Sequence, residues 1–462
     1  LASTPGPSVK RLGALAVTAA LVAAGCTTSG GQGASDGPTG TGDTTTTTEP
    51  DARTIAWSDC GGGFECGTLT VPLDYDEPDG DTIELAVTRH RADEPDERIG
   101  ALLVNPGGPG GSAVDLARSF PRAGELGDRF DIVGFDPRGV GGSSALNCNT
   151  HLQEMYDADP TFEDEQDEAT YLERSQAFVD ECTERYAEIL PHLGTSDVAR
   201  DMDEVRKALG EEQINYLGYS YGTSLGQEYA RQFPGQVRTM ILDGLVDHEP
   251  DGIATATGQA AGFETALDSY VEHCEIDGCG LSGPADDVID AVSAAAERDP
   301  IPAPSADRPA TPGVVSLALA QALYAEQLWS VLSAALRDAE EGDGSGLVGL
   351  ADQYLGRNPD NQDSDGLLKT DYCCGFEIYF AVSCLDETWP EDPQDVIEAA
   401  TEAERAVPRF GGAIVIDYLR CSLWPAEAQP LEPVPADLDG LPPVLVVSTT
   451  NDPATPYENG VA

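Results

Sequence analysis

The fold is decided by one stretch, Ile214-Asn215-Tyr216-Leu217-Gly218-Tyr219-Ser220-Tyr221-Gly222-Thr223-Ser224-Leu225-Gly226. Its apolar start predicts a strand over Ile214 to Leu217, and a helical pattern over Thr223 to Phe233 follows after a tight turn. Glycines two residues before and two after Ser220 are needed because side chains there would collide across the turn. The hydroxyl would stand at a helix N-terminus, where free N–H groups favour a developing negative charge. We therefore predict that Ser220 is a nucleophile; the alternative is a purely structural turn.

A glycine-rich loop follows another predicted strand, Ala101 to Val104, and reads Asn105-Pro106-Gly107-Gly108-Pro109-Gly110-Gly111-Ser112. Glycines let backbone N–H groups approach a substrate carbonyl closely. We expect the N–H groups of Gly108 and Tyr221 to form an oxyanion hole. A phosphate-binding loop is the alternative, but no Lys-Ser/Thr follows and the G-x-G-x-x-G spacing fits poorly.

Two further loops follow predicted strands. Pro443 to Val447 reads as a buried strand, and Asp452 comes soon after it, where an acid can orient a catalytic histidine; Thr455 is expected to hydrogen-bond nearby. The strand Phe130 to Phe135 leads into a turn in which Asp136 and Arg138 are expected to pair and brace neighbouring loops. We interpret this second turn as structural.

The order of the elements predicts the fold class. Strands are also expected over Gly67 to Leu73, Thr82 to Arg89 and Val237 to Leu242, and a helix over Ser196 to Leu209, with Ser196 as N-cap and Gly210 as its stop. Such alternation is typical of an α/β fold with a mostly parallel sheet and helices on both faces. Helical patterns such as Leu317 to Ala339 and Val396 to Val407 then predict an inserted cap. The core is expected to occupy residues 53–245 and 436–462, and the helical cap residues 246–435.

The N-terminus predicts export. Lys10 and Arg11 precede an apolar run that ends Ala23-Ala24-Gly25-Cys26, which resembles a lipobox. Residues 1–26 are therefore expected to be a signal peptide whose Cys26 is lipidated; an ordinary secretion signal is the alternative. Residues 27–52 have the composition of a disordered linker. The expected location is the outer face of the cell membrane, or the secreted fraction.

The composition limits the partners. A net charge of −57 repels nucleic acid and anionic lipid headgroups, so we expect membrane contact only through the N-terminal lipid. Apart from Cys26 there are ten cysteines, an even number that suits an oxidising compartment. Cys60 with Cys66 and Cys274 with Cys279 are close enough to close small loops, and Cys148 with Cys182 to staple an insertion. Pairing among Cys373, Cys374, Cys384 and Cys421 is open. No metal site and no cofactor are expected, since zinc-type spacing is absent.

Together these segments resemble the tripeptidyl aminopeptidase group of actinobacterial exported serine peptidases, which belong to the α/β-hydrolases and are related to prolyl iminopeptidases. The resemblance covers roughly residues 55–462, including Ala381 to Asp386 and Cys421 to Pro425. It implies an acyl-enzyme mechanism without a metal, which releases short peptides, in particular tripeptides, from substrates with free N-termini. Binding the amine requires an anion in the cap, for which the candidates are Glu264, Asp268, Glu326 and Asp386. The alternatives are a carboxylesterase or lipase-like hydrolase, and a non-catalytic peptide-binding lipoprotein.

The histidines depart from this pattern. All five (His90, His151, His192, His248 and His273) precede Asp452, whereas the order in this fold is Ser, Asp, His. Only His248, after the strand that follows the elbow, could lie near the site. We expect the final strand, helix and catalytic histidine to be missing from this chain, which would leave residues 1–462 nearly inactive. The oligomeric state stays open.

Overall fold

The computed structural model describes residues 54–148, 152–162, 165–356, 375–435 and 438–462. The predicted signal peptide, the linker, the lipidation site Cys26 and His151 lie outside these ranges, as do Cys373 and Cys374. Within the described ranges, no helix combines the length and the apolar character needed to cross a bilayer.

One sheet forms the core, with the strands in the order β1-β2-β3-β5-β4-β6-β7-β8. The strands are β1 (Ser58–Asp59), β2 (Phe64–Pro72), β3 (Thr82–His90), β4 (Gly100–Asn105), β5 (Phe130–Phe135), β6 (Ile214–Tyr219), β7 (Val237–Asp243) and β8 (Leu445–Val447). The pairs from β1 to β5 along this order are antiparallel, and all later pairs are parallel. Carboxyl ends of parallel strands meet at one edge of a sheet, so the loops after β4, β6, β7 and β8 gather there.

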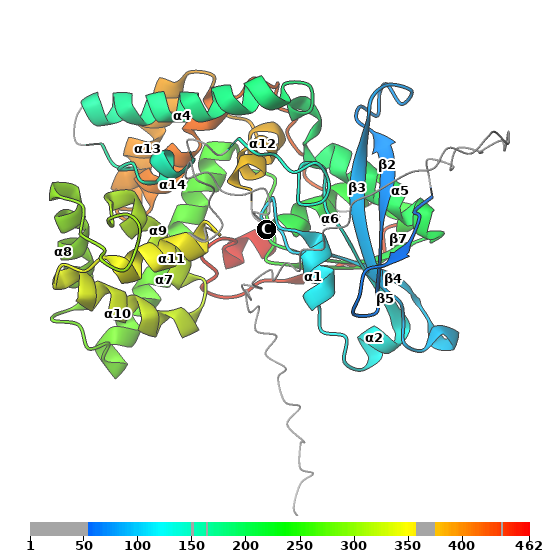
Figure 1. The fold of residues 1–462 in the computed structure, drawn as a ribbon, viewed down its shortest axis with the longest axis horizontal. Helices are drawn as coiled ribbons and strands as arrows, with labels where there is room; N and C mark the ends of the chain where they lie inside the picture. Colours follow the sequence, from blue (N-terminus) through cyan, green and yellow to red (C-terminus); the bar gives the residue numbers. More distant parts are fainter. Residues whose placement is uncertain (1–53, 149–151, 163–164, 357–374, 436–437) are drawn as a thin grey trace, which may run out of the picture. The chain divides into compact units, whose positions relative to one another are not determined.

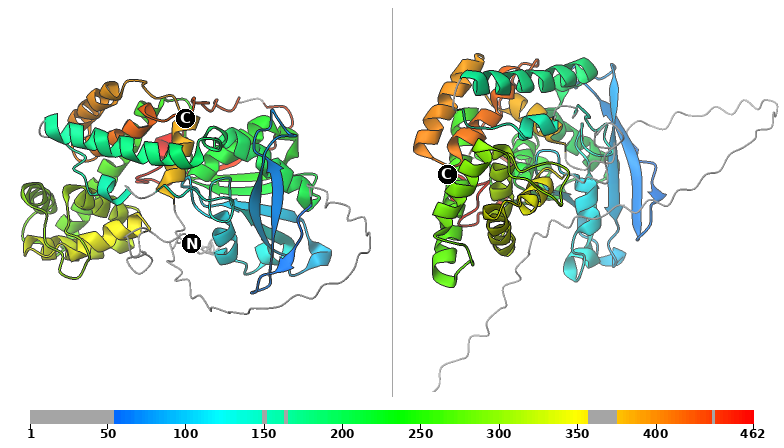
Figure 2. Two further views of the ribbon diagram at one scale, coloured as in Figure 1. Left: turned by 45° about the horizontal axis from the view of Figure 1, so that its top comes forward. Right: turned by 60° about the vertical axis from the view of Figure 1, so that its left-hand side comes forward.

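Helices cover both faces of the sheet, as Figures 1 and 2 show. In β4, Ala101 and Leu103 belong to a cluster with α5 (Thr195–Leu209) and α6 (Tyr221–Gln232). Leu102 and Val104, the alternate residues, pack with α1 (Ala113–Ser119) on the other face. A strand buried on both faces needs apolar residues throughout, which explains its lack of polar alternation. The predicted α/β fold, with a mostly parallel sheet and helices on both faces, is confirmed.

A helical cap follows β7. Its helices are α7 (Gly252–Asp277), α8 (Ala285–Arg298), α9 (Pro312–Leu323), α10 (Trp329–Glu340), α11 (Ser345–Tyr354), α12 (Phe376–Asp386), α13 (Pro393–Ala406), α14 (Gly411–Asp417) and α15 (Leu419–Ser422). They surround two hydrophobic clusters. One is built mainly from α7 to α11, and the other from α12 to α15 together with residues from 140–221.

An earlier segment joins the second of these clusters. The helix α2 (Glu125–Arg129) precedes β5. After β5 the chain forms α3 (Leu152–Tyr156) and α4 (Glu165–Tyr186). Phe178 of α4 is fully buried and lies edge-on to Phe380 of α12, with ring centroids 6.0 Å apart. Figures 1 and 2 show α4 running along α13 and α14. The cap therefore draws on residues from within 53–245 as well as from 246–435.

Three local predictions are corrected. The last strand forms, but Leu445, Val446 and Val447 are exposed rather than buried, because β8 is the edge strand among the described residues. The helix predicted over Leu317 to Ala339 is interrupted, and α9 and α10 are separate. The N-cap of α5 is Gly194, not Ser196, although Gly210 ends the helix in the left-handed conformation as predicted.

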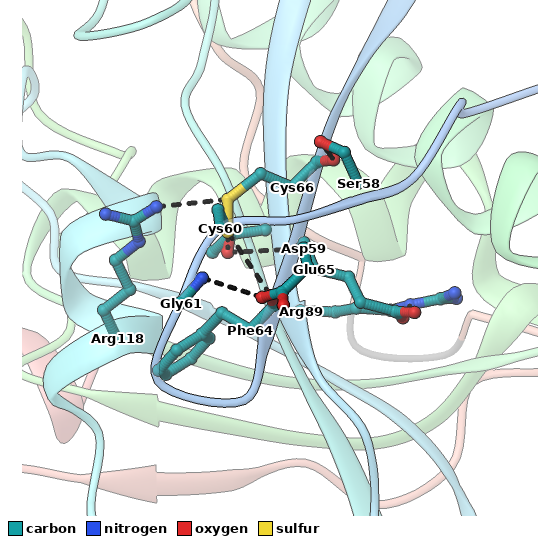
Figure 3. Close-up of a disulfide and its surroundings, with 10 residues drawn as sticks. Ser58, Asp59, Cys60, Gly61, Phe64, Glu65, Cys66, Arg89 and Arg118 are labelled. Carbon is teal, nitrogen blue, oxygen red and sulfur yellow. Dashed lines mark hydrogen bonds and ion pairs between the residues drawn. A yellow bond between two sulfur atoms is a disulfide. The ribbon is translucent and has the colours of Figure 1, made fainter. Parts of the chain in front are cut away.

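Four disulfides lie within the described residues. The predicted pairs Cys60–Cys66, Cys148–Cys182 and Cys274–Cys279 are confirmed, and Cys384 pairs with Cys421 across α12 and α15. Figure 3 shows the first pair at the turn between β1 and β2, where Arg118 donates to the Cys66 sulfur at 3.1 Å. Four disulfides are typical of a protein that folds in an oxidising compartment.

Candidate active site

The turn at Ser220 has the strained geometry of an elbow. Ser220 has φ 51° and ψ −124°, a conformation that non-glycine residues rarely adopt. A β-carbon on Gly218 would lie 2.2 Å from the carbonyl oxygen of Gly222, so the collision expected across the turn is confirmed. The hydroxyl of Tyr216 also donates to this oxygen, at 2.7 Å. Ser220, which is partly exposed, is therefore held rigidly between β6 and α6.

The glycine-rich loop after β4 lies directly against this elbow. A β-carbon on Gly107 would lie 2.4 Å from the Tyr219 carbonyl oxygen and 3.0 Å from the Tyr221 nitrogen. Only glycine permits such an approach, and its φ of 90° also favours glycine. The loop and the first residue of α6 thus face the same small space.

Free N–H groups are available on both sides of that space. The first N–H groups of a helix have no intrahelical acceptor, which applies to Tyr221 at the start of α6. The N–H of Gly107 is engaged, because it donates to Asn105 Oδ1 at 2.9 Å. Gly108, the residue predicted as the second donor, is exposed, and its N–H has no acceptor among the described residues. The arrangement could hold an oxyanion between Gly108 and Tyr221.

Asp452 organises the loop after β8. Its Oδ1 accepts hydrogen bonds from the N–H groups of Ala454 at 3.0 Å and Thr455 at 2.9 Å. Gln259 of α7 donates to the Ala454 carbonyl at 3.1 Å, so the cap also fixes this loop. Both of the bonds to Ala454 and Thr455 use the same carboxylate oxygen. The Asp452 side chain is partly exposed.

The loop that carries Asp452, here called the acid loop, approaches the elbow at Gly244, just after β7. A β-carbon on Gly244 would lie 2.8 Å from Thr455 Oγ1 and 3.7 Å from the Ser220 nitrogen. The neighbouring Asp243 is a second carboxylate at this edge. Burial and then the charge of Asp452 raise its pKa above the usual range. The predicted nucleophile and acid are therefore brought to one edge of the sheet.

The histidines of the described residues lie elsewhere. His248 sits beside Glu228 and Asp247, and burial lowers its pKa to about 4. His192 faces Asp197 at 4.0 Å, and His273 pairs with Asp277 at 3.3 Å. In the part of the chain that the structure describes, no histidine hydrogen-bonds to Ser220 or Asp452.

Asp136 and Arg138 do not pair with each other, which corrects that expectation. Arg138 is fully buried and forms a bidentate pair with Asp201 of α5, at 2.7 and 2.8 Å. Asp136 instead accepts from the Ser112 hydroxyl at 2.8 Å and from two backbone N–H groups, those of Val114 and Gly142. Each residue still braces neighbouring loops, Arg138 through a partner 63 residues away and Asp136 through partners 6 to 24 residues away.

The acidic candidates for binding an amine differ in what they contact. Asp268 and Glu326 are exposed, and Glu264 accepts from the N–H of Arg409 at 3.3 Å. Asp386 is buried and accepts from the N–H of Thr195 at 2.9 Å. Its neighbour Glu387 was not among the predicted candidates.

Glu387 differs from these four candidates because, among the described residues, it is the one of the five with a buried carboxylate oxygen that lacks a hydrogen-bond partner. Its Oε2 is buried and has no hydrogen-bond partner among the described residues. Burial, and then the charges of Asp386 and Asp251, raise its pKa to about 8. Trp389 stacks on Tyr418 beside it, with ring centroids 4.5 Å apart. The sequence offered no signal for this residue, because its surroundings come from α7, α12 and α14.

Comparison with known proteins agrees with this geometry. Residues 100–286 match the family described as alpha/beta hydrolase fold, and residues 406–462 match the family described as TAP-like protein. Serine protease Hip1 of Mycobacterium tuberculosis is 34% identical over 423 residues, which are 87% of this chain and 78% of the relative.

Two other relatives are about as similar. The tripeptidyl aminopeptidase of Streptomyces lividans is 32% identical over 434 residues, covering 88% of this chain and 77% of the relative. Carboxylesterase B of Mycobacterium tuberculosis is 37% identical over 419 residues, covering 86% and 76% respectively.

Proposed function

The chain belongs to the α/β-hydrolase family of tripeptidyl aminopeptidases and serine protease Hip1, and we propose that it is a serine exopeptidase that releases tripeptides from free N-termini. The observation that carries the proposal is the contact of Gly107 with the Ser220 elbow. It supports a site in which a nucleophile and two free N–H groups face one carbonyl.

In the proposed mechanism Ser220 Oγ attacks the scissile carbonyl carbon and gives its proton to a base, which in hydrolases of this fold is a histidine. Asp452 orients that base, and the N–H groups of Gly108 and Tyr221 hold the oxyanion. The proton then passes to the leaving amine, and an acyl-enzyme on Ser220 remains. Water hydrolyses this ester and releases the peptide.

Glu387 is the proposed anchor for the substrate's amino group. An ammonium group can donate to the unpartnered Oε2, and nearby aromatic faces also attract cations. Burial raises the pKa of this carboxyl because it makes the carboxylate costly to ionise, and an ammonium partner would offset that cost.

We infer the length of the peptide from the spacing of two contacts along α7. Gly252 packs against Trp389 beside the anchor, and Gln259, seven positions later, holds the acid loop through Ala454. Seven residues of helix span about 10 Å, which is also the span of about three extended residues. This match supports tripeptides as the released product.

Matched anilides test the specificity. In assays of the complete gene product, a free tripeptide anilide should be cleaved, and its N-acetylated form should be cleaved at least tenfold more slowly. Glu387→Gln should raise KM for the free tripeptide and leave the acetylated one unchanged, with exposed Glu391→Gln as the control. Equal cleavage of both substrates would contradict an exopeptidase.

An esterase is the second candidate, because carboxylesterase B is among the relatives. Turnover of a short-chain nitrophenyl ester without turnover of any tripeptide anilide would favour it. A non-catalytic peptide-binding lipoprotein would instead bind a tripeptide without cleaving either substrate.

We also propose that the protein is exported and held at the outer face of the membrane through a lipid on Cys26. The basic and apolar leader and the four disulfides support export. Cys26→Ser should abolish incorporation of a fatty-acid label and move the protein from the membrane fraction to the medium. Unchanged labelling would contradict the anchor.

A further inference from the structure

The side chain of Tyr221 connects the elbow to the cap. Tyr221 is buried, and its hydroxyl shares a hydrogen bond of 2.5 Å with the hydroxyl of Thr195. Thr195 is itself fully buried and is the first residue of α5. A bond between two hydroxyls, each with little access to water, fixes the Tyr221 ring with respect to α5.

Asp386, from the end of α12, completes the connection. The N-cap of α5 is Gly194, which has no side chain to accept from the helix N–H groups. Asp386 Oδ1 takes that place by accepting from the Thr195 N–H at 2.9 Å. A β-carbon on Gly194 would lie only 3.3 Å from this oxygen. Asp386, which belongs to the helical cap domain, therefore accepts a hydrogen bond from the N-terminus of α5, a helix of the α/β core.

The same helix, α12, also contacts the glycine-rich loop, and Figure 1 shows it near α6. Ile378 and Val382 of α12 line a small cavity together with Gly107, Gly110 and Tyr221. A β-carbon on Gly110 would lie 2.7 Å from Ile378 Cγ2. One cap helix therefore supports both sides of the space that faces Ser220.

We propose that Asp386, Thr195 and Tyr221 are positioning residues, through which the cap sets the orientation of the Tyr221 N–H toward the oxyanion. The proposal rests on the oxyanion role of that N–H given above. Stabilisation of an oxyanion depends on donors that are already aimed before the reaction. Tyr221 cannot tilt its backbone freely while its hydroxyl is tied to Thr195 and Thr195 is tied to Asp386.

The test uses the complete gene product and compares Tyr221→Phe, Thr195→Val and their double variant. Each single change should lower kcat by about tenfold, a fraction of the loss for a missing donor, and leave KM within about twofold. The double variant should be no slower than either single variant, because both break one bond. Thr195→Ser keeps the hydroxyl and should retain nearly full kcat.

Tyr229→Phe is the matched control. Tyr229 lies on the same helix, α6, nine residues after Ser220, and its buried hydroxyl donates to Asp203 of α5 at 3.2 Å. Its loss should lower the melting temperature about as much as Tyr221→Phe and leave kcat unchanged. If Tyr221→Phe and Thr195→Val leave kcat unchanged, or lower it only as much as Tyr229→Phe does, the positioning role is wrong.

Asp386→Asn tests the third member, since the amide oxygen can still accept from Thr195. Nearly full kcat in Asp386→Asn and a loss of about tenfold in Asp386→Ala are expected; equal values for the two would contradict the capping contact. The proposed function fails separately: if Ser220→Ala keeps its activity, the nucleophile is wrong, whereas an inactive Ser220→Ala beside a fully active Tyr221→Phe overturns only the positioning role.

Discussion

Gly107 and Ser220 meet at the carboxyl edge of the sheet, where a β-carbon on Gly107 would lie 2.9 Å from the Ser220 β-carbon. The two residues come from loops after β4 and β6, which are adjacent parallel strands. Their contact leaves no room for a side chain between the glycine-rich loop and the elbow. The loop can therefore present its N–H groups to a carbonyl bound at Ser220.

Gly107→Ala tests this contact. The added methyl group would collide with the Tyr219 carbonyl at 2.4 Å, and alanine is strained at φ 90°. Because the loop must move, we expect kcat to fall by about 10²-fold or more. Gly258→Ala in α7 has open space around the added methyl and should keep full kcat. Full activity of Gly107→Ala would contradict the placement of the loop.

Asp452→Asn should reduce kcat by roughly 10³- to 10⁴-fold. The amide oxygen can still accept from Ala454 and Thr455, so the loop should keep its shape while the charge is lost. Asp243→Asn is the control, because Asp243 ends the neighbouring strand β7 and lies close enough for the charge of Asp452 to raise its pKa. A larger loss for Asp243→Asn than for Asp452→Asn would assign the acid to Asp243.

Glu377 makes the stability of the protein depend on pH. It is almost fully buried in α12, its Oε2 has no partner among the described residues, and burial raises its pKa to about 7. The folded state thus holds the proton more tightly than the unfolded chain, so the stability from protonated Glu377 is lost as pH rises from about 4.5 through 7.

Glu377→Gln removes that proton equilibrium. Denaturant unfolding should find the variant more stable than the wild type at pH 8, by up to about 3 kcal/mol, and similar at pH 4.5. The exposed Glu402→Gln in α13 should change neither value. A variant that is less stable at pH 8 would show that the ionised carboxylate is stabilising there.

The disulfide Cys384–Cys421 should matter more than Cys274–Cys279. Loops of 37 and 5 residues predict about 4 and about 2 kcal/mol of stabilisation respectively. The first joins α12 to α15, and α12 supports Tyr221, so its double serine variant should also lower kcat. The double serine variant of Cys274 and Cys279 should lose stability alone. Equal kcat values in the two variants would contradict the link between α12 and the site.

Much of the site could be predicted because its chemistry is local in sequence. The glycines at 218 and 222 are required by the sterics of a five-residue turn, and this requirement reads directly from the chain. The strand β4 and its glycine-rich loop are likewise contiguous. The family resemblance rested on such segments, and the relatives confirm it.

The rest depends on partners that are distant in sequence. Arg138 pairs with Asp201, 63 residues away, rather than with nearby Asp136, because α5 brings the second carboxylate to a fully buried guanidinium. Asp386 caps α5 from 191 residues away. Neither the capping of Thr195 nor the free oxygen of Glu387 leaves a local pattern, since both depend on how α12 packs.

Reaction with a fluorophosphonate probe tests the central claim most directly. The complete gene product is labelled, digested and mapped by mass spectrometry, with Ser220→Ala and the neighbouring Ser224→Ala treated in parallel. We predict a single phosphonylated residue, Ser220, lost in Ser220→Ala and retained in Ser224→Ala. Labelling at another serine, or undiminished labelling of Ser220→Ala, would contradict the assignment of Ser220 as the nucleophile.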